Sequence, residues 1–224
     1  MKKTIIAAIG LLILLCSSQL VYGQDLSKYR NFSFGMSLAA VSKKVDLDAH
    51  ELQLIHQKPV LIQELTWYPR QHIGTSSAAE PVDKILFSFD NGTLYRMLIT
   101  YDRSAIKGLT DEDMVQIISA KYGVATRPVT EVNFPTNPSY NPTEKVIARW
   151  EDTEYSLNLF RSSATETFAI VIFDKHLDSQ AAASIAESVE LERQEAPQKE
   201  VERAKKETDD LERQRQKNIE VLRP

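Results

Sequence analysis

The fold is decided by residues 84–101, which read KILFSFDNGTLYRMLITY. Two runs rich in apolar and aromatic residues flank the dipeptide Asn91-Gly92, and runs of this kind are typical of β-strands. Asparagine and glycine both tolerate the positive φ angles that a two-residue hairpin turn requires. The sequence therefore predicts an antiparallel hairpin with Asp90 opposite Thr93, because the length of the turn sets the register.

Uninterrupted alternation would give this hairpin two unlike faces. The predicted core face contains Ile85, Phe87, Phe89, Leu94 and Leu98. The second face contains Leu86, Tyr95, Met97, Ile99 and Tyr101, interrupted by polar residues. Tyrosine and methionine are favoured at binding surfaces. The second face is therefore a candidate protein-binding surface, and burial beneath a loop or the C-terminal helix is the alternative.

The hairpin is part of a pattern that occurs twice, in residues 35–102 and 108–174. Each segment begins with apolar residues at helical spacing and continues with three runs of strand character. The runs are 60–68, 84–90 and 93–101 in the first unit, and 145–150, 154–161 and 166–173 in the second. We therefore predict one α+β domain over residues 24–175, built from tandem helix-plus-three-stranded antiparallel sheet units.

Four local signals refine this prediction. A second short helix is expected at 48–56, closed by Pro59. Thr110 and Asp113 have the spacing of a capping box at the start of a helix. A brief edge strand is expected at 129–134, next to several prolines. Residues 168–173 are apolar on both faces, which indicates a central strand.

Short motifs in this region resemble those of a known group of exported domains. They are Phe34-Gly35-Met36-Ser37 followed by Val41, the hairpin 89–94, and the helix end Lys121-Tyr122-Gly123. Over residues 30–174 the chain resembles the α+β domains of the BamE/SmpA-OmlA and β-lactamase-inhibitor-protein type. The resemblance implies a short helical pair packed against an antiparallel sheet, and a role in binding other proteins as an assembly accessory or an inhibitor. It transfers no functional residue to this chain.

The N-terminus has the pattern of a secretory signal peptide, residues 1–23. Lys2 and Lys3 precede an apolar run from Ile5 to Cys16, which is too short to span a bilayer. We expect cleavage before Gln24 and a periplasmic or extracellular protein. Cys16, the only cysteine, lies at the end of this apolar run, where the lipid of a bacterial lipoprotein is attached. A lipoprotein anchored at Cys16 is therefore the alternative, although Leu15 stands where a small residue is expected.

Charge and composition exclude several classes of partner. Without residues 1–23 the chain has 25 basic and 31 acidic residues, because Lys2 and Lys3 are removed from the total of 27. Nucleic acids and anionic lipid surfaces both reward basic patches, so neither is an expected partner. No later apolar stretch approaches the length of a membrane span.

Residues 176–224 form a charged tail with 12 acidic residues, 9 basic residues and no aromatic residue. Opposite charges at helical spacing favour a helix, and Pro197 is expected to break it into two. A heptad seam would contain Val201, Ala204, Thr208, Leu211, Arg215, Asn218 and Leu222. This seam is too polar for a strong coiled coil, so we expect a solvated helix, with self-association as the alternative.

No catalytic, metal-binding or cofactor-binding motif is present in the sequence. The four histidines, His50, His56, His72 and His176, lack the spacing of a metal site. No serine lies in a Gly-x-Ser-x-Gly turn, and no glycine-rich loop could hold a phosphate. The acidic cluster 111–113 is explained by the dipole at a helix start.

These observations favour a non-enzymatic envelope protein that binds another envelope protein through its sheet. Two alternatives stay open. One is a hydrolase whose site is assembled from scattered residues, which would need a deep pocket with converging polar groups. The other is a small-molecule or lipid carrier, which would need an apolar cavity between sheet and helices.

Overall fold

The computed structural model describes residues 25–45, 52–69, 80–134 and 142–223. The predicted signal peptide and Cys16 lie outside these residues. The described chain contains helices and a large antiparallel sheet, so the predicted α+β class is confirmed.

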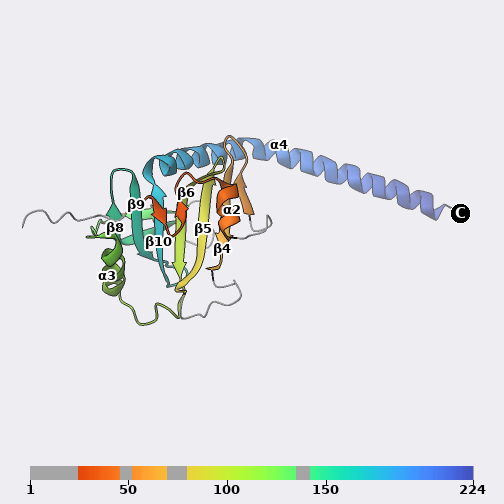
Figure 1. Ribbon diagram of the computed structural model, residues 1–224. Helices are drawn as coiled ribbons and strands as arrows, with labels where there is room; N and C mark the ends of the chain where they lie inside the picture. Colours follow the sequence, from red (N-terminus) through yellow and green to blue (C-terminus); the bar gives the residue numbers. More distant parts are fainter. Residues whose placement is uncertain (1–24, 46–51, 70–79, 135–141, 224) are drawn as a thin grey trace, which may run out of the picture.

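The sheet has eight strands in the order β3-β4-β5-β6-β10-β9-β8-β7. Two four-stranded meanders meet where β6 and β10 pair antiparallel, and Figure 1 shows these two strands at the middle of the sheet. The predicted central position of residues 168–173 is therefore confirmed. The strands are β3 (Leu52–His56), β4 (Ile62–Trp67), β5 (Val82–Asp90), β6 (Thr93–Tyr101), β7 (Glu131–Asn133), β8 (Thr143–Glu151), β9 (Tyr155–Arg161) and β10 (Phe168–Asp174).

The prediction of three-stranded units is not confirmed, because each meander has a fourth strand. In the first meander, residues 52–56 form β3 where a helix over 48–56 was predicted; residues 48–51 are outside the described part. β3 pairs antiparallel with β4, and this pairing satisfies backbone groups that a short isolated helix would leave exposed. In the second meander the edge strand predicted at 129–134 is present as β7, which pairs with β8.

One face of the sheet is covered by a small hairpin and two helices. The hairpin is β1 (Lys28–Tyr29) with β2 (Phe32–Ser33), and the helices are α2 (Leu38–Val45) and α3 (Asp111–Tyr122). Their buried side chains form the largest apolar cluster with the sheet residues beneath them. The predicted capping box of α3 is confirmed: the Thr110 hydroxyl accepts from the Asp113 N–H at 3.1 Å, and the Asp113 carboxylate accepts from the Thr110 N–H at 2.8 Å.

The other face is crossed by α4 (Lys175–Leu222), a helix of 48 residues, about 72 Å long at the usual rise per residue. Asp174 immediately precedes the helix, and its side chain caps the first turn by accepting hydrogen bonds from the N–H groups of His176 and Leu177. The buried residues Ala181, Ile185 and Ser188 recur at helical spacing and face the sheet. In Figure 1 the helix then continues far beyond the body.

The predicted break at Pro197 is wrong, because α4 is continuous through this proline. An ion pair of 2.7 Å between Glu195 and Lys199 spans it, and the residues that follow are mostly good helix formers. Pro197 instead marks a change of surroundings, since all side chains from Ala196 to Arg223 are exposed. None of the helices in the described part of the chain has the length and apolar composition needed to cross a bilayer.

Candidate functional site

The candidate site begins at an irregularity in β6. The pairing of β5 with β6 joins Phe89 to Leu94 and then Ser88 to Arg96, so Tyr95 is an extra residue. A bulge of this kind bends the strand and changes the direction of a side chain. As a result, Tyr95 packs against Ala181 and Ile185 of α4, and its neighbour Arg96 binds Asp178 of the same helix. Both side chains therefore point to the α4 face.

The bulge corrects the predicted binding face of the hairpin. Beyond it, Met97, Ile99 and Tyr101 join the cluster beneath α2 and α3, and the first two are fully buried. Only Leu86 and Tyr95 of the predicted set lie on the α4 face. Leu98, assigned to the core face, lies there too. The five residues therefore form no continuous surface, because one extra residue exchanges the two faces of a strand.

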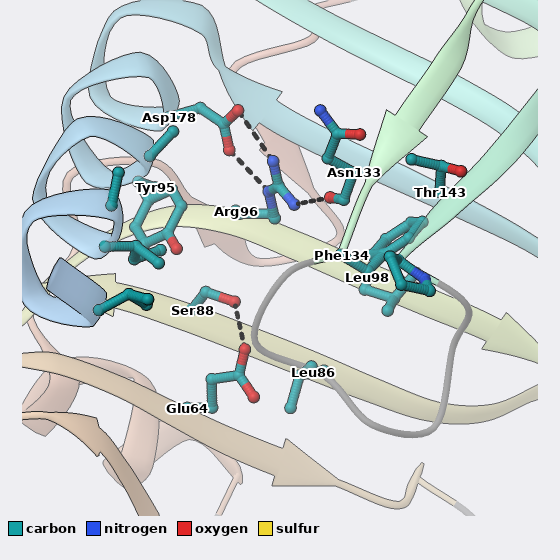
Figure 2. Close-up of a pocket in the computed structure, with 15 residues that line it drawn as sticks. Glu64, Leu86, Ser88, Tyr95, Arg96, Leu98, Asn133, Phe134, Thr143 and Asp178 are labelled. Carbon is teal, nitrogen blue, oxygen red and sulfur yellow. Dashed lines mark hydrogen bonds and ion pairs between the residues drawn. The ribbon is translucent and has the colours of Figure 1, made fainter. Parts of the chain in front are cut away.

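The α4 face contains a pocket of about 580 Å³, shown in Figure 2. Strands β4, β5 and β6 form its floor, α4 forms one wall, and residues 133–134 and 142–143 form the other. The second wall exists because Val132 and Phe134, from the β7 edge, pack with Leu86 and Leu98. The described lining residues are Glu64, Leu86, Ser88, Tyr95, Arg96, Leu98, Asn133, Phe134, Pro142, Thr143, Asp178, Ala182, Ile185, Ala186 and Val189.

Arg96 joins the floor of the pocket to both of its walls. It donates two hydrogen bonds to the Asp178 carboxylate, at 2.6 and 2.9 Å, and one to the Asn133 carbonyl, at 2.7 Å. Its guanidinium also lies 5.5 Å from the centre of the Phe173 ring. Burial alone would lower the pKa of Arg96, but the Asp178 carboxylate, together with Tyr95 and Glu64, outweighs burial and raises it. A charge pair that is largely removed from water therefore fastens α4 to the sheet.

A second polar group lies on the floor of the pocket. The Glu64 carboxylate accepts a hydrogen bond from the Ser88 hydroxyl at 3.5 Å, and both residues are almost fully buried. Tyr95 is also buried, and burial raises the pKa of its phenol. Arg96 opposes this rise, whereas Asp178 and Glu64 add to it. The phenol is therefore neutral at physiological pH.

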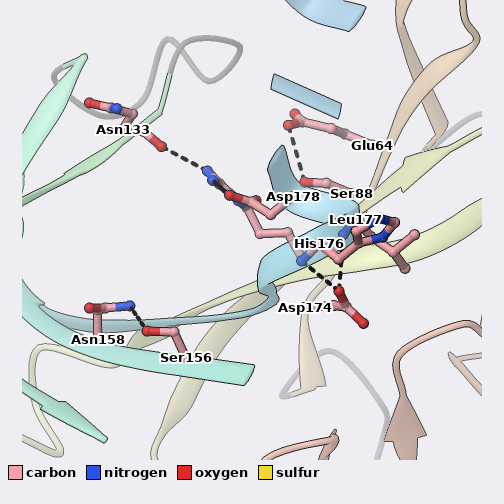
Figure 3. Close-up of polar contacts among 10 residues, drawn as sticks. Glu64, Ser88, Asn133, Ser156, Asn158, Asp174, His176, Leu177 and Asp178 are labelled. Carbon is pink, nitrogen blue, oxygen red and sulfur yellow. Dashed lines mark hydrogen bonds and ion pairs between the residues drawn. The ribbon is translucent and has the colours of Figure 1, made fainter. Parts of the chain in front are cut away.

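Figure 3 shows a further buried polar contact, between Asn158 and Ser156. Asn158 is fully buried and donates to the Ser156 hydroxyl at 3.0 Å. The Asn158 side-chain oxygen accepts from Arg149 at 2.6 Å. Near the far edge of the sheet, His56 Nδ1 lies 3.0 Å from a Glu192 carboxylate oxygen, which connects β3 to α4. Hydrogen-bonded groups of this kind fix the positions of the strands around the pocket.

The cavity has features that suit the binding of a small molecule. The cavity has the volume typical of ligand sites, an apolar majority in its lining, and a few polar groups that would orient a ligand. Among the described residues no group of three or more histidine, cysteine or acidic side chains is arranged to hold a metal ion. No histidine is among the described residues that line the pocket.

Sequence reasoning missed most of this site. The local sequence pattern singles out none of Glu64, Arg96 and Asp178. One signal is present in the sequence. Arg96 is a lone charged residue inside the apolar run 94–101, so its guanidinium requires either a buried partner or access to solvent. That partner lies 82 residues further along the chain, and nothing in the local pattern identifies it.

The fold and the pocket define this chain as an α+β protein with a ligand-sized cavity between an eight-stranded sheet and a long C-terminal helix. No protein family, curated protein or solved structure matches it. The resemblance to domains of the BamE/SmpA-OmlA and β-lactamase-inhibitor-protein type therefore stays a prediction.

Proposed function

We propose that this chain is an exported binding protein that holds a small, mostly apolar molecule in the pocket beneath α4. The observation that carries the proposal is the cavity of about 580 Å³ lined mainly by apolar side chains. Pockets for small ligands and cofactors commonly have volumes of about 300–1,000 Å³ and a similar mixture of apolar and polar groups. The proposal thus favours the carrier reading of the sequence over the protein-binding sheet face.

The walls support this proposal because they are held in place without a ligand. The bidentate contact between Arg96 and Asp178 fixes the first turns of α4, and the bond from Arg96 to the Asn133 carbonyl fixes β7. A cavity that exists before binding costs little to organise when the ligand enters. Export rests on Lys2, Lys3 and the apolar run that follows them.

Filling the pocket tests the proposal. We expect the neutral fluorescent probe N-phenyl-1-naphthylamine to bind the wild-type protein saturably. Ala182→Phe should weaken binding at least about tenfold, equivalent to about 1.4 kcal/mol, because Ala182 lines the cavity and the new ring would occupy it. Fluorescence titration at constant protein concentration measures the dissociation constant.

The matched control is Ala183→Phe, since Ala183 is exposed on the same helix and does not line the pocket. This variant should bind the probe as the wild type does. Thermal unfolding of both variants shows that each is folded. Absence of saturable probe binding, or equal binding by both variants, would contradict the proposal.

A second candidate function is the binding of another envelope protein, favoured by the distal part of α4. Every residue from Ala196 to Arg223 is exposed, including Val201 at 68 % and Leu211 at 66 %. A long helical segment whose side chains are all exposed is available to a partner. Replacing Val201 and Leu211 with serine should abolish capture of one specific partner from envelope extract, whereas Ala182→Phe should leave it intact. Capture that is unaffected by the serine variant would exclude this helix.

A further inference from the structure

The hydroxyl group of Tyr95 indicates a chemical feature that the ligand of the pocket would carry. Tyr95 lines the pocket and is only 4 % exposed. Figure 2 shows its ring beside α4, with the hydroxyl on the side facing Ser88. We infer, building on the proposed function, that the pocket selects an uncharged, mostly apolar molecule with a hydrogen-bond acceptor such as a carbonyl oxygen, and that the Tyr95 hydroxyl donates to this acceptor.

The Tyr95 hydroxyl has no hydrogen-bond partner among the described residues. Its neighbour Arg96, in contrast, already donates to Asp178 and to the Asn133 carbonyl. A polar group that is removed from bulk water is normally paired, because leaving it without a partner costs free energy. A ligand acceptor beside the Tyr95 hydroxyl would supply the missing hydrogen bond.

Two properties make the hydroxyl a donor. Its oxygen lone pair is delocalised into the ring, so a phenol donates a hydrogen bond more readily than it accepts one. Burial raises the pKa of Tyr95, so the proton stays on the oxygen at neutral pH. An uncharged acceptor suits this site best, because moving a charge into a mainly apolar cavity costs far more than moving a carbonyl group.

The Tyr95 ring is held in place before a ligand binds. The bulge in β6 turns it to the α4 face, where it packs with Ile62 of β4 and with Ala181 and Ile185 of α4. A donor that is already fixed costs little to organise when the ligand enters. The apolar body of the ligand would then lie against other lining residues, such as Leu98.

Two ligands of similar shape test this inference in the wild type and in Tyr95→Phe. Benzophenone has a carbonyl group where diphenylmethane has a methylene group. Each is titrated against the protein loaded with N-phenyl-1-naphthylamine, whose own dissociation constant is first measured for every variant. We expect Tyr95→Phe to weaken the binding of benzophenone about fivefold, the effect of one hydrogen bond, and to leave the binding of diphenylmethane unchanged.

The matched control is Tyr101→Phe. It removes the same group from the same strand, but Tyr101 packs in the cluster beneath α2 and α3 and is not among the described lining residues. Both ligands should bind this variant as they bind the wild type. Thermal unfolding shows that both variants are folded.

Infrared spectroscopy of bound benzophenone gives a second measurement. A hydrogen bond weakens the carbonyl bond, so its stretching frequency should be lower in the wild-type complex than in hexane. In the complex with Tyr95→Phe the frequency should return toward the value in hexane. The comparison of the wild-type complex with hexane does not depend on any variant.

The outcomes separate this inference from the proposed function. Equal effects of Tyr95→Phe on both ligands, or no effect on either, would overturn the hydrogen bond while the pocket remains a binding site. A carbonyl frequency in the wild-type complex equal to that in hexane would overturn it as well. Failure of N-phenyl-1-naphthylamine to bind the wild type saturably would overturn both proposals.

Discussion

At the scale of single residues, Arg96 determines how the two sides of the molecule are joined. It lies at a bulge in the central strand β6 and contacts α4 through Asp178 and β7 through Asn133. The pair is mostly buried, so each charge depends on the other for its solvation. A buried pair of this kind contributes mainly by specifying one arrangement of the elements around it, and here that arrangement forms the pocket.

Removing one charge should therefore cost more than removing both. We expect Arg96→Met to lower the free energy of unfolding by about 3 kcal/mol, because Asp178 is left buried and unpaired. The double variant Arg96→Met with Asp178→Leu should recover most of this loss. Urea unfolding measures both values. The control is Arg127→Met, whose partner Glu112 is 62 % exposed, and it should cost less than about 1 kcal/mol. Equal losses in both single variants would contradict this account.

At the scale of elements, α4 is one helix with two different environments. From Lys175 to Glu195 it has a buried stripe that packs on the sheet, and from Ala196 onward its side chains are exposed. Among the described residues, the exposed part is supported by contacts along its own surface, such as the pair Glu195–Lys199. Each pair of this kind contributes a few tenths of a kcal/mol, so the end of the helix should open far more readily than the docked part.

Pro197→Ala should stabilise this exposed part without affecting the body. Alanine restores one backbone hydrogen bond, and the two residues differ by about 3 kcal/mol in a helix interior. Hydrogen exchange over residues 198–210 should slow, while the midpoint of global unfolding should not change. Gln198→Ala changes no backbone group and serves as the control. Exchange that is the same in Pro197→Ala and the wild type would show that the proline does not weaken the helix.

At the scale of the whole molecule, the sheet is the middle one of three layers. The β1–β2 hairpin, α2 and α3 cover one face, and α4 covers the other, where Val132 and Phe134 from the β7 edge also pack. Stability comes from the two buried faces, because burial of apolar surface is the dominant favourable contribution to folding. The exposed end of α4 takes no part in either face.

Deleting residues 197–224 should therefore leave the stability of the body unchanged within about 0.5 kcal/mol. By comparison, Ile185→Ala in the full chain should cost about 2–4 kcal/mol, since Ile185 is 8 % exposed and packs between α4 and the sheet. Urea unfolding followed by tryptophan fluorescence measures both, because Trp150 is buried in the body. A large loss on deletion would mean that the end of α4 contributes to the core.

Local chemistry explains what could be predicted. The Asn91-Gly92 turn, with φ of 48° and 76°, and the Thr110–Asp113 capping box both depend on residues adjacent in the chain. The strand at 168–173 was also recognisable from its own composition. The site could not be predicted, because its walls come from β4, β6, β7 and α4. Tyr95 is also an extra residue in β6, and the side chains that follow it therefore point to the face opposite to the predicted one.

The sequence by itself determined the class of fold, the central hairpin and the charged helical character of the C-terminal segment. Short-range hydrogen bonds and hydrophobic periodicity specify these features, and both can be recognised from short stretches of sequence. The tertiary structure alone decided that residues 52–56 are a strand, that Pro197 lies inside one helix, and that Arg96 meets Asp178. These outcomes depend on which distant groups satisfy a backbone bond or a buried charge, and only the folded chain brings those groups together.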